Sequence, residues 1–349
     1  MSGPFFCRTM DDMTTNPLHC ATVSEQTTTT DPVMPEASMN LVRPNAPVTG
    51  RVVSNDMCLK SKANVWVRHT EIDVSGTPLE GNFLVGQSFG VIAPGVAANG
   101  KPHKVRLYSI ACPSWGEDGN GKIVSTTPKR LIDEYKPQRA GDEADRHSLF
   151  IGVCSNFLCD LVPGDEVQVT GPAGKRFLLP VNTADHDYVF IATGTGIAPF
   201  RGMVQELLEH PDGPCRSRIH LLMGSPYTSD LLYDDLFRKL EAEHENFSYH
   251  TAISREKRPD GSRGIYVQAL IGEQLDTFGP MLENPRTLVY MCGLLGMDAG
   301  IYQAMATHNL AGQYITIGDE LQGVAPADWT GKQIKRQIKA TPRCMVECY

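Results

Sequence analysis

Residues 188–201 read YVFIATGTGIAPFR and join a continuous apolar run to two glycines and a helix-like pattern. The apolar run is typical of a strand buried on both faces, as strands of parallel sheets are. Beyond the glycines, apolar residues recur at helical spacing until Pro211, which predicts a helix that packs by one face. That face comprises Phe200, Met203, Val204, Leu207 and Leu208.

The glycine pair lies where the predicted strand turns into the predicted helix. Gly194 and Gly196 would let the backbone approach a pyrophosphate, and the helix N-terminus would offer free amide donors. Pro199 stands where the usual fingerprint has a third glycine, and proline is acceptable at the start of a helix. A G-x-G alone is as easily a plain tight turn, but the flanking strand and helix favour a dinucleotide site.

The rest of the chain divides into two unlike halves. In the second half, apolar strands at residues 219–222 and 288–291 alternate with helical stretches, which predicts an α/β doubly wound parallel sheet. In the first half, short alternating segments such as residues 65–67 are separated by Gly and Pro turns, which is typical of an antiparallel β-barrel or sandwich. We therefore predict a polar, disordered tail (1–47), a β-barrel domain (48–181) and an α/β domain (182–349).

Composition narrows the class of protein. A net charge of −8 argues against a nucleic-acid partner, and no apolar run approaches the roughly 18 residues of a membrane span. The ten cysteines are scattered; Cys154 and Cys159 have part of an iron–sulfur spacing, but no C-x2-C follows, so we expect reduced thiols and no metal. With only Arg8 as a basic residue before Arg43, the tail does not support a plastid-like location, and we expect a cytoplasmic, reducing compartment.

Ser254 and Arg255 follow another alternating segment, residues 249–253. At the carboxyl end of a parallel strand they would lie beside the nucleotide crevice, where a hydroxyl and a guanidinium suit a 2'-phosphate. Tyr266 and Arg263 could add an aromatic face and a second charge. A surface ion pair remains the alternative for Arg255.

Two further motifs lie in the first half. Arg106 could pair with a phosphate and Tyr108 could stack on a flat ring at the end of an extended segment. The turn at residues 152–155, GVCS, could offer backbone amides to an anion around Ser155. Taken separately, each motif could equally be ordinary core or turn.

Together, long motifs at consistent spacing resemble plant-type ferredoxin–NADP reductase from about residue 48 to residue 349. The motifs are NGKPHKVRLYSIA (99–111), GVCSNFLCDL (152–161), GTGIAPFR (194–201), LLY (231–233), SRE (254–256), MCGL (291–294) and VECY (346–349).

The resemblance implies an FAD-binding barrel followed by an NADP-binding sheet. FAD would be held by Arg106, Leu107, Tyr108, Ser109, Lys129, Gly152, Val153, Cys154 and Ser155. NADP would be held by Gly194, Thr195, Gly196, Ser254, Arg255, Arg263, Tyr266 and Gly293. The reacting atoms would be surrounded by Ser109, Cys292 and Glu347, and Tyr349 would cover the flavin face on which nicotinamide must stack. A basic rim of Lys101, Lys104, Lys129 and Lys335 would meet an acidic electron carrier.

The chain departs from the family pattern at three places. Gly264 replaces a lysine that commonly lies two residues before the adenine tyrosine. Asp133, with Tyr135 nearby, stands where a tyrosine often stacks on the FAD adenine, and a charged insertion occupies residues 136–147. The adenine contacts are therefore left open.

The function that the resemblance implies is electron transfer between NADP(H) and a one-electron carrier, ferredoxin or flavodoxin, through FAD. An NADPH-dependent reductase component for an oxygenase, or a general diaphorase, is an alternative, although such components usually carry a fused iron–sulfur or FMN domain. A non-catalytic NADPH-sensing flavoprotein is a second alternative, against which the retained Ser109, Cys292, Glu347 and Tyr349 argue.

Overall fold

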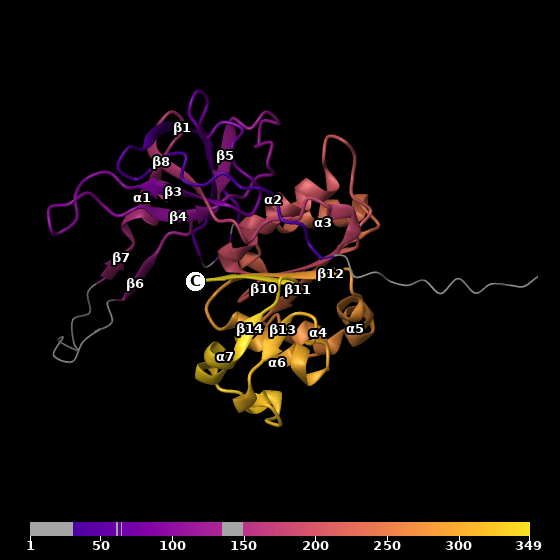
Figure 1. The fold of residues 1–349 in the computed structure, drawn as a ribbon. Helices are drawn as coiled ribbons and strands as arrows, with labels where there is room; N and C mark the ends of the chain where they lie inside the picture. Colours follow the sequence, from indigo (N-terminus) through magenta and orange to yellow (C-terminus); the bar gives the residue numbers. More distant parts are fainter. Residues whose placement is uncertain (1–30, 61, 64, 135–148) are drawn as a thin grey trace, which may run out of the picture.

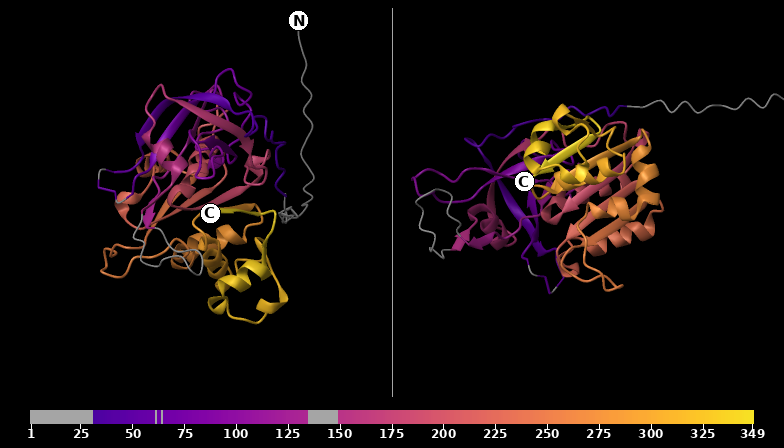
Figure 2. Two further views of the ribbon diagram at one scale, coloured as in Figure 1. Left: turned by 90° about the vertical axis from the view of Figure 1, so that its left-hand side faces the viewer. Right: turned by 90° about the horizontal axis from the view of Figure 1, so that it is seen from below.

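The computed structural model describes residues 31–60, 62–63, 65–134 and 149–349. It contains an antiparallel sheet in the first half and a parallel sheet in the second, and the C-terminus lies between the two halves (Figure 1 and Figure 2). The predicted fold class is thereby confirmed. Within the described residues, no helix is long and apolar enough to cross a membrane.

The first sheet has the order β4-β3-β8-β1-β2-β5. Its inward residues, such as Val52, Ile72 and Val91, are buried and form one core. Just after β4, the Ala111 amide donates to the carbonyl of Ser125 on β5 at 2.9 Å, which draws the two edges of the sheet together as in a barrel. The strands are β1 (Val48–Met57), β2 (Arg68–Asp73), β3 (Ser88–Ile92), β4 (Arg106–Ser109), β5 (Ile123–Thr126) and β8 (Glu166–Ala173).

A small hairpin and a short helix extend from this sheet. The hairpin pairs β6 (Ile132–Glu134) with β7 (Leu149–Ile151), and α1 (Val153–Asp160) follows directly. The sequence predicted only a turn at residues 152–155; the structure instead begins a helix there, with Gly152 as its N-cap.

The second sheet is parallel, in the order β11-β10-β9-β12-β15. Its strands are β9 (Asp187–Thr193), β10 (Ile219–Ser225), β11 (Phe247–Ile253), β12 (Thr287–Gly293) and β15 (Cys344–Cys348). The central strands β9 and β12 are almost wholly buried because helices cover both faces. In Figure 1, α2 and α3 lie on the face toward the barrel, and α4, α5 and α6 on the other.

The α-helices of this half are α2 (Ile197–Leu208), α3 (Asp234–Glu243), α4 (Ala269–Glu273), α5 (Leu275–Glu283), α6 (Met297–Thr307) and α7 (Gly331–Gln337). Short 3-10 turns are η1 (Thr183–Asp185), η2 (Gly194–Gly196), η3 (Thr228–Asp230), η4 (Asp319–Leu321) and η5 (Pro326–Asp328), and β13 (Ile315–Ile317) pairs with β14 (Ile338–Ala340). The predicted strand and helix on either side of the glycine pair are β9 and α2. Helix α2 also contacts the barrel, because a Cβ at Gly202 would overlap the Cys112 carbonyl.

Part of the predicted tail packs on the protein. Val42 is buried and its amide donates to the Gly171 carbonyl at 2.9 Å, while the fully buried Gln87 side chain donates to the Ser38 carbonyl. Residues 1–30, Tyr135 and the insertion at 136–147 lie outside the described residues.

Candidate active site

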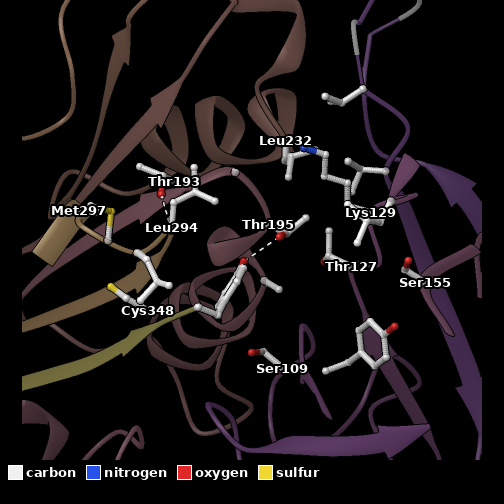
Figure 3. Close-up of a pocket in the computed structure, with 18 of the residues that line it drawn as sticks. Ser109, Thr127, Lys129, Ser155, Thr193, Thr195, Leu232, Leu294, Met297 and Cys348 are labelled. Carbon is white, nitrogen blue, oxygen red and sulfur yellow. Dashed lines mark hydrogen bonds between the residues drawn. The ribbon is translucent and has the colours of Figure 1, made fainter. Parts of the chain in front are cut away.

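One large cavity lies between the two sheets. Its volume is about 1500 Å³, and residues of both domains line it. Figure 3 shows Ser109, Thr127 and Ser155 from the barrel on one side and Thr193, Thr195 and Met297 from the second domain on the other. The cavity brings together these residues of the prediction: Lys104, Arg106, Leu107, Tyr108, Ser109, Lys129, Gly152, Val153, Cys154, Ser155, Gly194, Thr195, Ser254, Arg255, Tyr266, Glu347 and Tyr349.

On the barrel side, β4 is an edge strand, and its one partner among the described strands is β3. Its free edge and its extended backbone present Arg106, Tyr108 and Ser109 to the cavity. The Tyr108 hydroxyl lies against the Cys154 thiol, and burial raises the pKa of Tyr108, so the phenol stays neutral. An aromatic ring and a guanidinium thus lie two residues apart on one strand.

The start of α1 forms the next part of this wall. Gly152 caps the helix and no side chain of the described residues caps its first amides, which are therefore available to an anion. Space is restricted there: a Cβ at Gly152 would come within 2.8 Å of Ser155 Oγ and 2.9 Å of Leu131 Cβ. The Asn156 side chain holds the turn by donating to the Gly152 carbonyl at 2.6 Å.

On the opposite side, the η2 loop connects β9 to α2. Gly194 adopts a left-handed backbone (φ 55°), and a Cβ at Gly196 would overlap the Cys292 carbonyl. Glycine meets both requirements, since it tolerates a positive φ and carries no Cβ, and among the described residues no side chain caps α2 either. The loop can therefore bring backbone amides close to a phosphate.

Ser254 and Arg255 lie just beyond β11, as the parallel sheet required. Their amides donate to the carbonyls of Ser225 (3.0 Å) and Pro226 (2.9 Å), which fixes the turn beside the end of β10. Arg255 is exposed at the cavity, whereas Arg263 does not line it. The Arg255 guanidinium can thus reach a ligand phosphate.

The last strand carries the chain end into the cavity. Strand β15 runs parallel to β12, with Glu347 opposite Cys292. The Tyr349 amide donates to the Gly293 carbonyl at 3.0 Å, and the Leu295 amide donates to the Tyr349 carbonyl at 3.1 Å. A 2.7 Å hydrogen bond joins the Tyr349 hydroxyl to Thr195 Oγ1 (dashed in Figure 3), while 55% of the residue stays exposed.

Burial sets the charge of the groups around Tyr349. It raises the pKa of Glu347 to about 7, so this carboxyl is partly protonated at neutral pH. It also raises the pKa of the Cys292 thiol, which keeps its proton. Cys292 lies beneath the cavity surface, and neither it nor Gly196 nor Gly293 is part of the lining. Of the predicted basic rim, Lys101 and Lys335 also lie outside the lining.

The cavity includes residues that the motifs did not indicate. Ser225 ends β10, and the rule that ligands bind at the carboxyl ends of parallel strands could have found it. Thr127 comes from the barrel and Phe150 from the hairpin, and neither has a local sequence signal. Leu294 is an exposed apolar residue that ends the MCGL motif, and the sequence assigned it no role.

These features define the class: a two-domain oxidoreductase in which a parallel sheet binds a pyridine nucleotide against a barrel. The family model described as the oxidoreductase NAD-binding domain matches residues 190–303. A Plasmodium falciparum ferredoxin–NADP+ reductase structure matches with a TM-score of 0.62 at 22% identity, covering 89% of this chain and 99% of that one, which supports the fold.

Sequence relatives specify the family. The ferredoxin–NADP reductase of Thermosynechococcus vestitus is 42% identical over 271 residues, 76% of this chain and 67% of the relative. That of a Spirulina species is 37% identical and covers 89% of this chain and 98% of the relative. The chloroplastic leaf-type isozyme of Nicotiana tabacum is 38% identical, covering 89% and 79%. The chain belongs to the ferredoxin–NADP reductase family.

Proposed function

We propose that this protein transfers electrons between NADP(H) and a one-electron carrier, ferredoxin or flavodoxin, with FAD as its cofactor. The observation that carries the proposal is that one cavity among the described residues has both a wall suited to flavin, on β4 and α1, and a wall suited to a nucleotide, on η2 and β11. Tyr349 lies between the two walls. Family membership gives the same activity.

The donor set of the barrel wall fits FAD. Arg106 and the uncapped amides of α1 can hold a pyrophosphate, and Tyr108 offers a ring face for the flavin. Gly152 leaves room where a Cβ would obstruct the turn. Bound FAD would accept a hydride from NADPH and release its electrons singly.

The chain's own residues would align the reactants and manage the proton. Ser109 Oγ can hydrogen-bond the flavin edge, and the Glu347 carboxyl, with a pKa of about 7, can give or take a proton near the same place. Cys292 is buried beneath the cavity surface, so it would act indirectly, by packing under the residues that line the site. These roles are part of the proposal.

NADP(H) would bind along the second wall. The amides around Gly194 and Thr195 would meet the pyrophosphate, and Ser254 and Arg255 the 2'-phosphate, with Tyr266 exposed to stack on adenine. We therefore propose NADP(H) selectivity that depends on Arg255.

We propose that the acidic carrier approaches at the basic rim. Lys104 and Lys129 are exposed and line the cavity, and Lys101 is exposed close to Lys104 in sequence; Lys335, on α7, would extend the rim only as a separate cation. Against a net charge of −8, such a local cluster would orient an acidic partner. Association should therefore slow as ionic strength rises.

The division at residues 181–182 and the compartment are also proposals. The division falls between β8 and β9, the last barrel strand and the first strand of the parallel sheet. The cysteines of the described residues are all free thiols, which suits a cytoplasmic, reducing compartment.

Purified protein tests the function directly. We expect bound FAD, loss of flavin absorbance on adding NADPH, and reduction of ferredoxin or flavodoxin that is much faster with NADPH than with NADH. A protein that bound FAD and NADPH but reduced neither carrier would contradict the proposal and favour a sensing role.

A further inference from the structure

The LLY motif, residues 231–233, lies between η3 and α3 and makes an unusual turn. Leu232 lines the cavity, whereas Tyr233 does not. Tyr233 adopts a left-handed backbone conformation (φ 56°), which is unfavourable for a residue with a large side chain. Such a conformation persists only where surrounding contacts hold it.

The Tyr233 hydroxyl makes those contacts with the other domain. It hydrogen-bonds Thr127 Oγ1 at 2.6 Å and His69 Nδ1 at 2.9 Å, and the His69 and Tyr233 rings meet edge to face at 5.7 Å. His69 lies on β2 and Thr127 follows β5, so both partners come from the barrel. One hydroxyl thus connects the two domains.

A buried ion pair supports the same connection. The Arg201 guanidinium lies over the Tyr233 ring at 5.4 Å and donates to both carboxylate oxygens of Glu117, at 2.5 and 3.1 Å. Glu117 Oε1 is also 3.2 Å from His69 Nε2. Burial opposes ionisation of Glu117, but His69 and Arg201 outweigh it and lower the pKa of Glu117 to about 2, so the carboxylate is charged. We name Tyr233, His69, Thr127, Arg201 and Glu117 the interdomain clasp.

The clasp lies directly behind both walls of the cavity. Thr127 itself lines the barrel side, and Leu232, adjacent to Tyr233, lines the nucleotide side. Arg201 lies on α2, whose N-terminus follows the η2 loop. A change in the clasp would therefore move one wall relative to the other without touching the groups assigned to FAD or to the 2'-phosphate.

We propose that Tyr233 is a positioning residue: its hydroxyl fixes how the two domains face each other, and so aligns nicotinamide with the flavin. The inference rests on the proposed function and assigns a role to a motif that the function leaves unused. Alignment matters because a misplacement of about 1 Å can slow a reaction roughly a hundredfold.

The test is Tyr233→Phe, which keeps the ring over Arg201 and removes only the hydroxyl. Three quantities are measured on the FAD-loaded protein or its apoprotein: FAD affinity, affinity for 2'-phospho-AMP, and the rapid-reaction rate of flavin reduction by NADPH. FAD and 2'-phospho-AMP would each bind to one domain, so neither affinity should depend on how the domains face each other. We expect both affinities to stay within about twofold of the parent values while flavin reduction slows about tenfold to a hundredfold.

Tyr314→Phe is the matched control. It removes a buried hydroxyl that donates to the Leu282 carbonyl at 2.9 Å wholly within the second domain. A general loss of stability would affect both variants alike, whereas alignment should fail only in Tyr233→Phe. A double-mutant cycle with Thr127→Val adds an independent check. The double variant should slow flavin reduction no more than Tyr233→Phe does alone.

Flavin reduction at the parent rate in Tyr233→Phe would overturn the inference, as would additive effects in the cycle. A parallel loss of FAD or 2'-phospho-AMP affinity would also overturn it, because the hydroxyl would then support binding or folding. Failure of the parent itself to bind FAD or react with NADPH would instead refute the proposed function.

Discussion

Removal of the Tyr349 side chain should strengthen the binding of oxidised NADP and slow turnover. On the proposed function, nicotinamide would have to occupy the flavin face that the Tyr349 ring would cover, so the ring would compete with it. The backbone of Tyr349 is held separately, by its hydrogen bonds with Gly293 and Leu295. Displacement of the ring therefore breaks only the side-chain contacts and leaves β15 in place.

The size of the effect follows from those contacts. The 2.7 Å hydrogen bond to Thr195 contributes about 0.5–1.5 kcal/mol, and ring stacking about 0.5–1.5 kcal/mol more. Their sum, about 1–3 kcal/mol, predicts NADP+ binding roughly fivefold to 150-fold tighter in Tyr349→Ser. Tyr349→Phe loses only the hydrogen bond and should bind about fivefold tighter than the parent.

Difference spectroscopy of the flavin during NADP+ titration measures these affinities, and steady-state rates with NADPH and NADH measure the consequence. Tighter ground-state binding without an equal gain in the transition state lowers kcat. Discrimination against NADH should also weaken, because binding would depend less on the 2'-phosphate. Unchanged NADP+ affinity and NADH discrimination in FAD-loaded Tyr349→Ser would refute the reasoning.

Four further outcomes are expected. Arg255→Ala should weaken NADPH binding about tenfold to a hundredfold, since a charge-assisted hydrogen bond contributes about 1.5–3 kcal/mol, and should leave the KM for NADH unchanged. Since burial raises the pKa of Glu347 to about 7, the flavin-reduction rate should show an inflection near pH 7 that is absent in Glu347→Gln. Burial lowers the pKa of His220 to about 4, so the folded state resists protonation of this side chain. The free energy of unfolding in urea should therefore fall as the pH drops from 6.5 towards 4, by roughly 3 kcal/mol more than in His220→Gln. Phe150 is half exposed and lines the cavity, and we expect its ring to stack on the adenine that FAD has and FMN lacks. Phe150→Ala should therefore weaken FAD binding by about 1–3 kcal/mol in a fluorescence titration, while FMN binding and the Leu149→Ala control stay at parent values.

The parallel sheet could be predicted because its signal is local. Residues 188–192 of β9 are apolar without interruption and α2 repeats its apolar residues at helical spacing, so each element can be predicted from its own residues. Helix α1 has no such signal: its N-cap is glycine, no side chain in the described part of the chain caps it, and its first turn carries no acidic residue. Packing of Cys154 and Leu158 into the barrel core makes it a helix, and packing cannot be read from eight residues.

The depth of Cys292 depends on a pairing between distant segments. Only the insertion of β15 beside β12 sets Glu347 against Cys292, and this register decides which residue reaches the cavity and which lies beneath it. The family resemblance predicted that Glu347 and Cys292 both lie near the reacting atoms. It could not predict that Glu347 lines the cavity while Cys292 lies beneath its surface. The same holds for the clasp, whose members come from both domains.

The structure explains why Gly264 stands where the family commonly has a lysine. A Cβ there would overlap the carbonyl oxygens of Ile253 and Glu256, so a lysine cannot occupy this position without movement of the backbone. Arg263, one residue earlier, does not line the cavity and therefore does not replace it. Within the described residues that line this part of the cavity, Arg255 supplies the guanidinium, with the hydroxyl of Ser254 beside it. Because one cation rather than two would meet the 2'-phosphate, the part of the selectivity for NADPH that comes from 2'-phosphate contacts should depend mainly on Arg255, and the charge-assisted bond of that one residue sets its size.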